Sequence, residues 1–177
     1  MVINWKKVTI GQFDQLAEIK SNDPFKLKLQ QIAILEGLEI EDVMAWDVED
    51  VQAFDVNAPM PKRRLRFYFF HNNKYYRLPK NAKKIKAAQF IDLQTSDGTI
   101  AMNLSILSQR VNIWGKVIPE DITERIEEFK TIPVYKIKPY SDFFLRLYPL
   151  LLEATHAYLK QTMKEVKEMD NELTPMQ

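Results

Sequence analysis

The chain has 177 residues, of which 46% are hydrophobic and 28% are charged, and its formal net charge is +1. This composition is ordinary for a protein with one core, and the length suits one domain with an appended helical arm. The absence of cysteine excludes disulfides, thiolate metal sites and cysteine nucleophiles. No apolar run is long enough to span a bilayer, and the first residues lack a signal-peptide pattern. We therefore expect a protein of the cytosol or of a virion interior.

The near-neutral net charge conceals a strong segregation of charge along the chain. No basic residue lies between Lys28 and Lys62, and this interval holds eight acids between Glu36 and Asp55. No acidic residue lies between Asp55 and Asp92, and this interval holds ten cations. Two such blocks can pair within one molecule or between two copies of it.

The acidic half of the chain carries the start and stop signals of several helices. Thr9 and Gln12 have the spacing of a capping box. Asp23 and Pro24 suit the N-cap and first position of a second helix, and Gly37 tolerates the positive φ of a helix stop. Two short acidic helices follow, the second capped by Asp47, before Pro59 and Pro61 end the helical part. These signals predict helices at residues 10–19, 24–36, 39–45 and 47–54.

Residues 65–78 predict a β-hairpin with Asn72 and Asn73 as its two-residue turn. In this register Phe69 faces Tyr76. One face of the hairpin is then mostly apolar. Because a lone hairpin is marginally stable in water, we expect it to pack on the helices or on another subunit. The opposite face carries Arg66, Tyr68, Phe70, Tyr75 and Arg77.

The rest of the chain again favours helices. Residues 88–93 echo residues 11–16, which indicates two similar helix entries. Ser141 is expected to cap a long C-terminal helix that Pro149 kinks. The predicted elements are helices at 80–95 and 99–109, a short extended segment within 111–118, and an acidic surface helix at 119–130.

The predicted fold class is mainly α (α+β), a multi-helix domain with one β-hairpin. A single domain is expected over residues 1–160, followed by a charged helical extension and a frayed tail at residues 161–177. Within the domain, we expect a helical part at 8–56, the hairpin at 62–80 and a second helical part at 84–160.

No motif for catalysis, cofactor binding or metal binding is found. The two histidines, His71 and His156, lack metal-ligand spacing, and the four glycines never cluster into a phosphate-binding loop. The acids of residues 36–55 stand mostly at predicted helix starts, where capping and the helix dipole account for them. We therefore expect a protein that is not an enzyme, with no catalytic residue, no cofactor and no metal.

The basic hairpin region admits three interpretations. Cations interleaved with aromatic residues are typical of a surface that binds nucleic-acid backbone and stacks bases. Alternatively, the aromatic side chains form a buried face and the cations only solubilise its rim. In the third interpretation, the hairpin docks on the acidic helices of a neighbouring molecule. The candidate contact residues are Arg63, Arg64, Arg66, Lys74 and Arg77.

One stretch carries a family resemblance. An apolar helix ends in Gly37-Leu38, the acidic pair Glu41-Asp42 follows, and residues 46–51 read Trp-Asp-Val-Glu-Asp-Val. This pattern resembles the small helical tail assembly chaperones of tailed bacteriophages, which usually have Ser or Thr where Glu39 stands. Residues 5–16 resemble longer versions from phages of Bacteroidetes, including crAss-like phages.

The resemblance implies a non-enzymatic phage morphogenesis protein that shields apolar surfaces of tail components in the host cytoplasm during assembly. Its alternative is a structural virion protein retained near the portal or tail or inside the capsid, touching DNA through the basic aromatic hairpin. The implied partners are phage tail, portal or other virion proteins and further copies of the chain, with nucleic acid less favoured and no membrane. The implied partner-binding residues are Glu41, Asp42, Trp46, Asp47 and Asp50.

Overall fold

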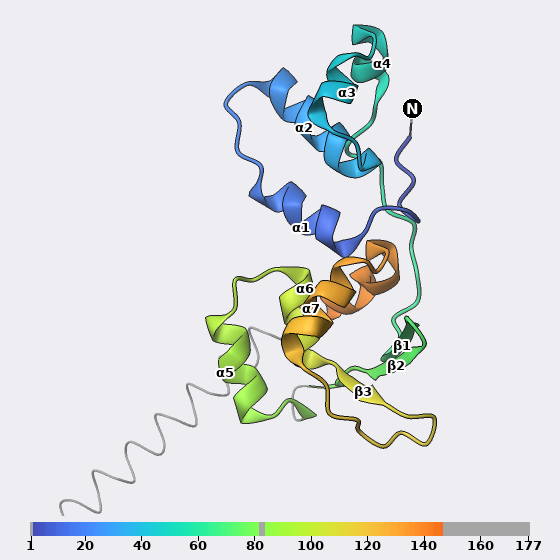
Figure 1. Ribbon diagram of the computed structural model, residues 1–177, viewed down its shortest axis with the longest axis vertical. Coiled ribbons are helices and arrows are strands. Elements are labelled where there is room, and N and C mark those ends of the chain that lie inside the picture. Colours follow the sequence, from blue (N-terminus) through green and yellow to red (C-terminus); the bar gives the residue numbers. More distant parts are fainter. Residues whose placement is uncertain (1, 82–83, 147–177) are drawn as a thin grey trace, which may run out of the picture. The chain divides into compact units, whose positions relative to one another are not determined.

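The computed structural model describes residues 2–81 and 84–146 (Figure 1). The chain divides into two units, residues 1–141 and 142–177, and the elements below belong to the first unit unless stated. The fold is mainly α with a small antiparallel sheet, which confirms the predicted class. The predicted kink near Pro149, His156, the boundary near residue 160 and the tail lie outside the described residues.

The first two helices begin and end as their capping signals predict. α1 (Ile10–Glu18) has the expected capping box, in which Thr9 Oγ1 accepts from the Gln12 amide at 3.3 Å. In return, Gln12 Oε1 accepts from the Thr9 amide at 2.9 Å. α2 (Pro24–Glu36) starts at Asp23, whose carboxylate accepts from two amides of the first turn. It ends at Gly37 with φ of 68°, in the left-handed region that favours glycine.

Two short helices complete the acidic half. α3 (Ile40–Met44) and α4 (Val48–Ala53) lie where they were predicted and pack against α2. Val43 and Val51 are their buried residues. Asp47 occupies the N-cap position of α4, but its side chain makes no capping hydrogen bond, so that detail of the prediction was wrong. The burial of apolar side chains against α2 is therefore what we expect to hold these short helices.

The predicted hairpin forms in the predicted register and gains a third strand. β1 (Tyr68–His71) pairs antiparallel with β2 (Lys74–Arg77), with Phe69 opposite Tyr76. Asn72 and Asn73 have φ of 45° and 60°, as a type I′ turn requires. β3 (Gln109–Val111) pairs with β2, so the sheet order is β1-β2-β3. The extended segment predicted within residues 111–118 therefore begins earlier, at Gln109, where the chain forms a strand.

Three helices follow the hairpin in the sequence, and β3 lies between the second and third of them. α5 (Ala87–Thr95) and α6 (Ile100–Leu107) form a packed pair, and α7 (Ile122–Lys130) packs on α6. α5 begins at Ala87 rather than at residue 80, so the predicted start was wrong. The lysines of residues 80–86 explain the difference, since positive charge at a helix N-terminus opposes the macrodipole.

The surface helix predicted at residues 119–130 forms as α7, with most of its residues exposed and one side packed into the core. α7 starts at Ile122, and its side chains Arg125 and Phe129 are buried. Ser141 differs from its predicted role, because residues 134–146 are helical and Ser141 lies inside that helix. Burial of Val134, Ile137 and Tyr140 outweighs the preference of serine for the N-cap position.

α1 links the acidic half to the rest of the first unit. It packs on α2 and also on α6 and α7. The carboxylate of Asp14 accepts from the amides of Ile100 and Ala101 at 2.8 and 3.1 Å, which caps the start of α6 from another helix. The largest fully buried side chains include Ile10, Ile32, Phe54, Tyr76, Leu78, Leu107, Phe129 and Ile132.

Candidate functional site

The loop after α2, together with α3 and α4, presents a continuous series of exposed acids, which we call the acidic surface. Three large apolar side chains of the same segment are also exposed: Leu38 by 40%, Met44 by 64% and Val48 by 58%. Apolar side chains that gather on a surface commonly mark a contact with another macromolecule. The acidic surface comprises Glu36, Glu39, Glu41, Asp42, Asp47, Glu49 and Asp50.

The acidic surface has no cationic partner among the described residues. Lys74, Arg110, Arg125 and Lys130 form ion pairs with acids of residues 120–128 and not with the acidic surface. The acidic and basic blocks of the sequence therefore do not neutralise each other within residues 2–81 and 84–146.

Four of the five predicted partner-binding residues belong to this surface. Glu41 and Asp42 stand in the first turn of α3, Asp47 precedes α4, and Asp50 stands in the first turn of α4. Trp46 differs, because it is only partly exposed and its ring centroid lies 6.4 Å from that of Phe54 in the core. Trp46 therefore contacts the core as well as solvent.

The predicted basic contact residues fall into two groups. Arg64 and Arg66 are exposed, and the guanidinium carbon of Arg63 lies 5.2 Å from the centre of the Tyr135 ring, within cation–π range. Arg77 Nη2 donates to Gln109 Oε1 at 2.8 Å, a neutral partner that leaves its charge uncompensated. Lys74 belongs to a second group, since carboxylates surround it.

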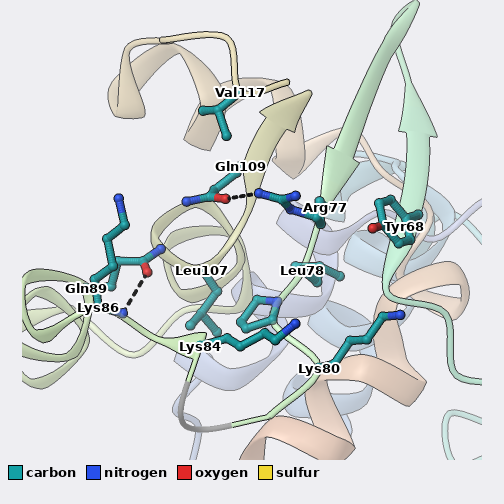
Figure 2. Close-up of a pocket in the computed structure, with 11 residues that line it drawn as sticks. Tyr68, Arg77, Leu78, Lys80, Lys84, Lys86, Gln89, Leu107, Gln109 and Val117 are labelled. Carbon is teal, nitrogen blue, oxygen red and sulfur yellow. Dashed lines mark hydrogen bonds between the residues drawn. The ribbon is translucent and has the colours of Figure 1, made fainter. Parts of the chain in front are cut away.

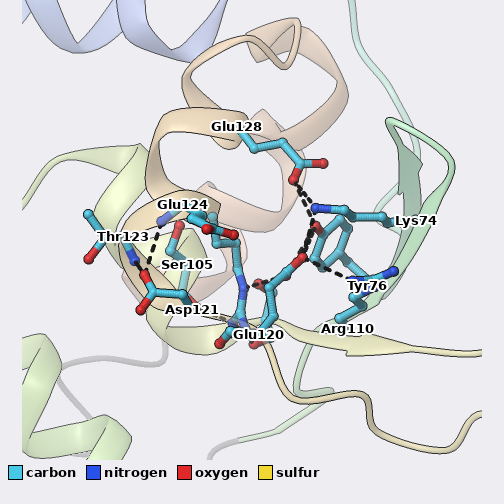
Figure 3. A network of polar contacts seen from close by, with 11 residues as sticks. Lys74, Tyr76, Ser105, Arg110, Glu120, Asp121, Thr123, Glu124 and Glu128 are labelled. Atoms are coloured by element: carbon cyan, nitrogen blue, oxygen red, sulfur yellow. Dashed lines mark hydrogen bonds and ion pairs between the residues drawn. The ribbon is translucent and has the colours of Figure 1, made fainter.

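A polar network holds Lys74 against the loop before α7 and against α7 itself (Figure 3). Lys74 Nζ lies 2.8 Å from Glu120 Oε1 and 2.6 Å from Glu128 Oε2. Glu120 has a side chain only 4% exposed and also accepts from Arg125 Nε at 3.0 Å. The hydroxyl of Tyr76 donates to the same carboxylates. The network fixes the hairpin to α7 and leaves Lys74 little capacity for a ligand.

The protonation states in this network follow from its contacts. Burial would raise the pKa of Glu120, but hydrogen bonds from Lys74 and Arg125 outweigh it and hold that pKa below its usual value. Hydrogen bonds to Glu120 and Glu128 raise the pKa of the Lys74 ammonium. Burial, then the two nearby carboxylates, raises the pKa of the Tyr76 phenol. At neutral pH the Glu120 carboxylate is therefore negative and the Lys74 ammonium is positive, so their attraction stabilises the fold.

The aromatic residues of the hairpin are divided between two faces. Phe69 stacks on Tyr76 at a centroid distance of 5.1 Å, and the edge of Phe129 closes this cluster. On the opposite face, three rings are exposed by 45% to 51%. Some aromatic residues of the hairpin therefore pack in the core, and others are exposed on its surface. The exposed aromatic face, as we call it, comprises Tyr68, Phe70 and Tyr75.

A basic pocket of about 490 Å³ adjoins the exposed aromatic face (Figure 2). Tyr68 and the Arg77–Gln109 pair line it, as do three lysines that precede α5. In Figure 2, Val117 lies at the top of the view and Lys80 and Lys84 at the bottom, with the Arg77–Gln109 pair between them. None of the described residues that line this pocket is acidic. The three lysines are Lys80, Lys84 and Lys86.

The selection of individual site residues from the sequence missed these three lysines and Gln109. The lysines could have been found from the lack of any acid between Asp55 and Asp92, which leaves their charge unbalanced. Gln109 carries no comparable signal, because only the pairing of β3 with β2 brings it opposite Arg77.

The turn after β3 presents two further exposed apolar side chains. Ile113 is exposed by 76% and Trp114 by 85%. Asn112 Oδ1 accepts from the amides of Trp114 and Lys116 at 3.0 and 2.9 Å, so the turn has a defined conformation. This turn was not among the residues predicted to bind a partner.

The described residues contain no cluster of three or more metal-ligating side chains of the His, Cys, Asp and Glu types. Of the two histidines, the described one is His71, whose Nε2 lies 2.9 Å from Thr131 Oγ1. Burial lowers the pKa of its imidazole. Among the described helices, none combines the length and apolarity needed to cross a membrane.

Fold and surfaces together define a mainly α protein that presents an acidic surface and, elsewhere, a basic pocket beside exposed aromatic side chains. No family model, no curated protein and no solved structure matches this chain.

Proposed function

We propose that this chain is a non-enzymatic bacteriophage morphogenesis protein of the tail assembly chaperone type, which acts through protein–protein contacts. Its support in the sequence is the glycine-stopped helix followed by two acidic helices. The observation that carries the proposal is the acidic surface, whose charges lack cationic partners among the described residues. Its exposed Leu38, Met44 and Val48 add apolar area that a partner can cover.

Both features suit a protein that covers apolar segments of other proteins. Apolar side chains supply affinity, and the surrounding acids steer the encounter toward basic partners and disfavour acidic ones. In this proposal the partners are phage tail or portal proteins, and the contact forms in the host cytoplasm before the particle is complete.

Charge reversal tests this function. An affinity-tagged chain is expressed during phage infection, and the phage proteins that co-purify with it are identified by mass spectrometry. We expect Asp42→Lys combined with Asp50→Lys to lose the tail proteins that the unaltered chain retains. Asp92→Lys is the matched control, because Asp92 is an exposed acid on α5 outside the acidic surface. Retention of every partner by the double variant, or no phage protein in either sample, would reject the proposal.

The second candidate is a structural virion protein that stays in the particle, near the portal or tail or inside the capsid, and touches DNA. The basic pocket beside exposed aromatic side chains favours it. Mass spectrometry of purified virions separates the two candidates. Many copies per particle support the structural role, whereas presence only in the lysate of infected cells supports the transient chaperone role.

A further inference from the structure

The basic pocket and the exposed aromatic face form one continuous surface. Antiparallel pairing places Tyr68, Arg77 and Gln109 side by side in one row of the sheet. Because side chains alternate along a strand, the neighbouring residues on the same face of β1 and β2 are Phe70 and Tyr75. Tyr68 and Arg77 also line the pocket, so the aromatic face continues into it (Figure 2).

The pocket concentrates positive charge without internal compensation. None of its four cations forms an ion pair among the described residues, and the partner of Arg77 is the neutral amide of Gln109. Lys86 stands at the N-cap of α5, where its charge adds to the positive end of the helix dipole. An anion in the pocket would relieve this repulsion. The four cations are Arg77, Lys80, Lys84 and Lys86.

The aromatic side chains indicate what kind of anion fits. Phe70 and Tyr75 lie with ring centroids 4.7 Å apart, and both remain about half exposed together with Tyr68. Exposed rings beside a positively charged groove are the arrangement on which unpaired bases stack while the backbone follows the cations. A duplex does not satisfy this surface, because its bases are already stacked and its faces are hidden.

From these observations we propose that this surface binds single-stranded nucleic acid, with phosphodiester groups in the basic pocket and bases stacked on Tyr68, Phe70 and Tyr75. The cavity of about 490 Å³ is within the range of about 300–1,000 Å³ typical of ligand sites. The inference rests on the second candidate function, which it deepens by naming a single strand and its contact residues. It is independent of the chaperone role.

The test is the binding of a fluorescently labelled oligothymidylate of about 20 nucleotides, long enough for one site, followed by anisotropy. A parallel oligouridylate distinguishes DNA from RNA as the source of the phosphodiester, and either ligand supports the proposal. We expect affinity to fall between about 50 and 200 mM salt, with a log–log slope near −0.7 for each phosphate contact. A duplex of the same length should bind more weakly.

Two sets of variants separate the charges from the rings. Combining Lys80→Ala, Lys84→Ala and Lys86→Ala should weaken binding and reduce the slope by about 2, because up to three phosphate contacts are lost. Combining Tyr68→Ala and Tyr75→Ala should weaken binding by about 5- to 150-fold for each base unstacked, with the slope unchanged.

Matched controls lie away from this surface. Lys26→Ala removes an exposed cation from α2, and Phe25→Ala removes a ring of the same helix that is exposed by 46%, close to the 45% of Tyr75. Neither control should alter binding, and circular dichroism checks that every variant is folded. The charge reversals at Asp42 and Asp50 should not weaken it either, which keeps failure of this inference distinct from failure of the chaperone role.

Several results would overturn the inference. They are no binding at the lowest salt, equal affinity for duplex and single strand, equal losses in the control variants, or competition by polyglutamate as effective as that by unlabelled oligothymidylate. The last result would assign the surface to an acidic protein partner, such as a second copy of the chain.

Discussion

The side-chain amide of Gln12 donates to the carbonyl of Ile34 across 2.7 Å, although 22 residues separate them. The same side chain also closes the capping box of α1, so one residue fixes a helix start and the end of the next helix. Gln89 repeats the contact, donating to the carbonyl of Ile106 at 2.6 Å. The two similar helix entries of the sequence thus make equivalent contacts in the α1–α2 and α5–α6 pairs.

Replacing Gln12 should therefore weaken the fold more than its partial exposure suggests. We expect Gln12→Ala to lower the free energy of unfolding by about 1–2 kcal/mol, since both the capping hydrogen bond and the bond to α2 are lost. Urea denaturation followed by circular dichroism measures the change. Gln15→Ala, an exposed position on the same helix, should change it by less than about 0.5 kcal/mol. Equal effects of the two substitutions would contradict this role.

The network around Glu120 should dominate the electrostatic stability of the sheet. Glu120→Ala is expected to cost about 3 kcal/mol, because it leaves the largely buried Arg125 without its carboxylate partner and leaves Lys74 with Glu128 alone. Glu127→Ala serves as the comparison. Glu127 lies 2.7 Å from Lys130 in a pair whose side chains are 68% and 47% exposed, and its loss should cost about 0.5 kcal/mol or less. The prediction is wrong if chemical denaturation gives similar values for both.

The same network predicts a pH dependence. The pKa of Glu120 lies below its usual value of 4.5 in the folded state, so its contribution is complete above pH 4.5 and is lost as pH falls through the folded pKa. Glu120→Gln resembles the protonated side chain. We expect the difference in unfolding free energy between the two proteins to be largest near neutral pH and to shrink at acidic pH. A difference that does not change with pH would exclude this contribution.

Gly37 should be sensitive to substitution for two reasons. Its φ of 68° is strained for alanine, and an added Cβ would lie 3.3 Å from Gln12 Nε2. Gly98→Ala is the control, since φ there is 81° but no atom lies within 4 Å of the added Cβ. Each substitution should cost about 1 kcal/mol through backbone strain, and Gly37→Ala should cost more. The excess should disappear when Gln12 is also replaced by alanine, as thermal unfolding of the double variant would reveal.

Most of the local structure could be predicted from the sequence. The capping box at Thr9, the stop at Gly37 and the hairpin turn at Asn72-Asn73 all appear as expected. Each depends on side chains and φ preferences only a few residues apart. Predictions from single residues were less accurate where packing against distant parts of the chain favours a different structure. Ser141 is a good capping residue, but it lies inside the helix at residues 134–146. The buried apolar residues of that helix that precede Ser141 are Val134, Ile137 and Tyr140.

The two candidate sites also differ in how far the sequence predicts them. The acidic surface could be read from the sequence, since its acids lie on short neighbouring helices. The basic pocket could not, because it depends on β3 joining β2 and on the lysines before α5 approaching the sheet.

By itself, the sequence determined the capped helices, the register of the hairpin and the separation of acidic from basic residues. All of these follow from local hydrogen bonds, φ preferences and composition. Only the tertiary structure decided which charges are buried: Glu120, expected on a surface helix, lies at the centre of the ion-pair network, whereas the acids before and within α4 remain exposed. The reason is that burial depends on which elements pack together, and an acid can be buried only where distant cations such as Lys74 approach it.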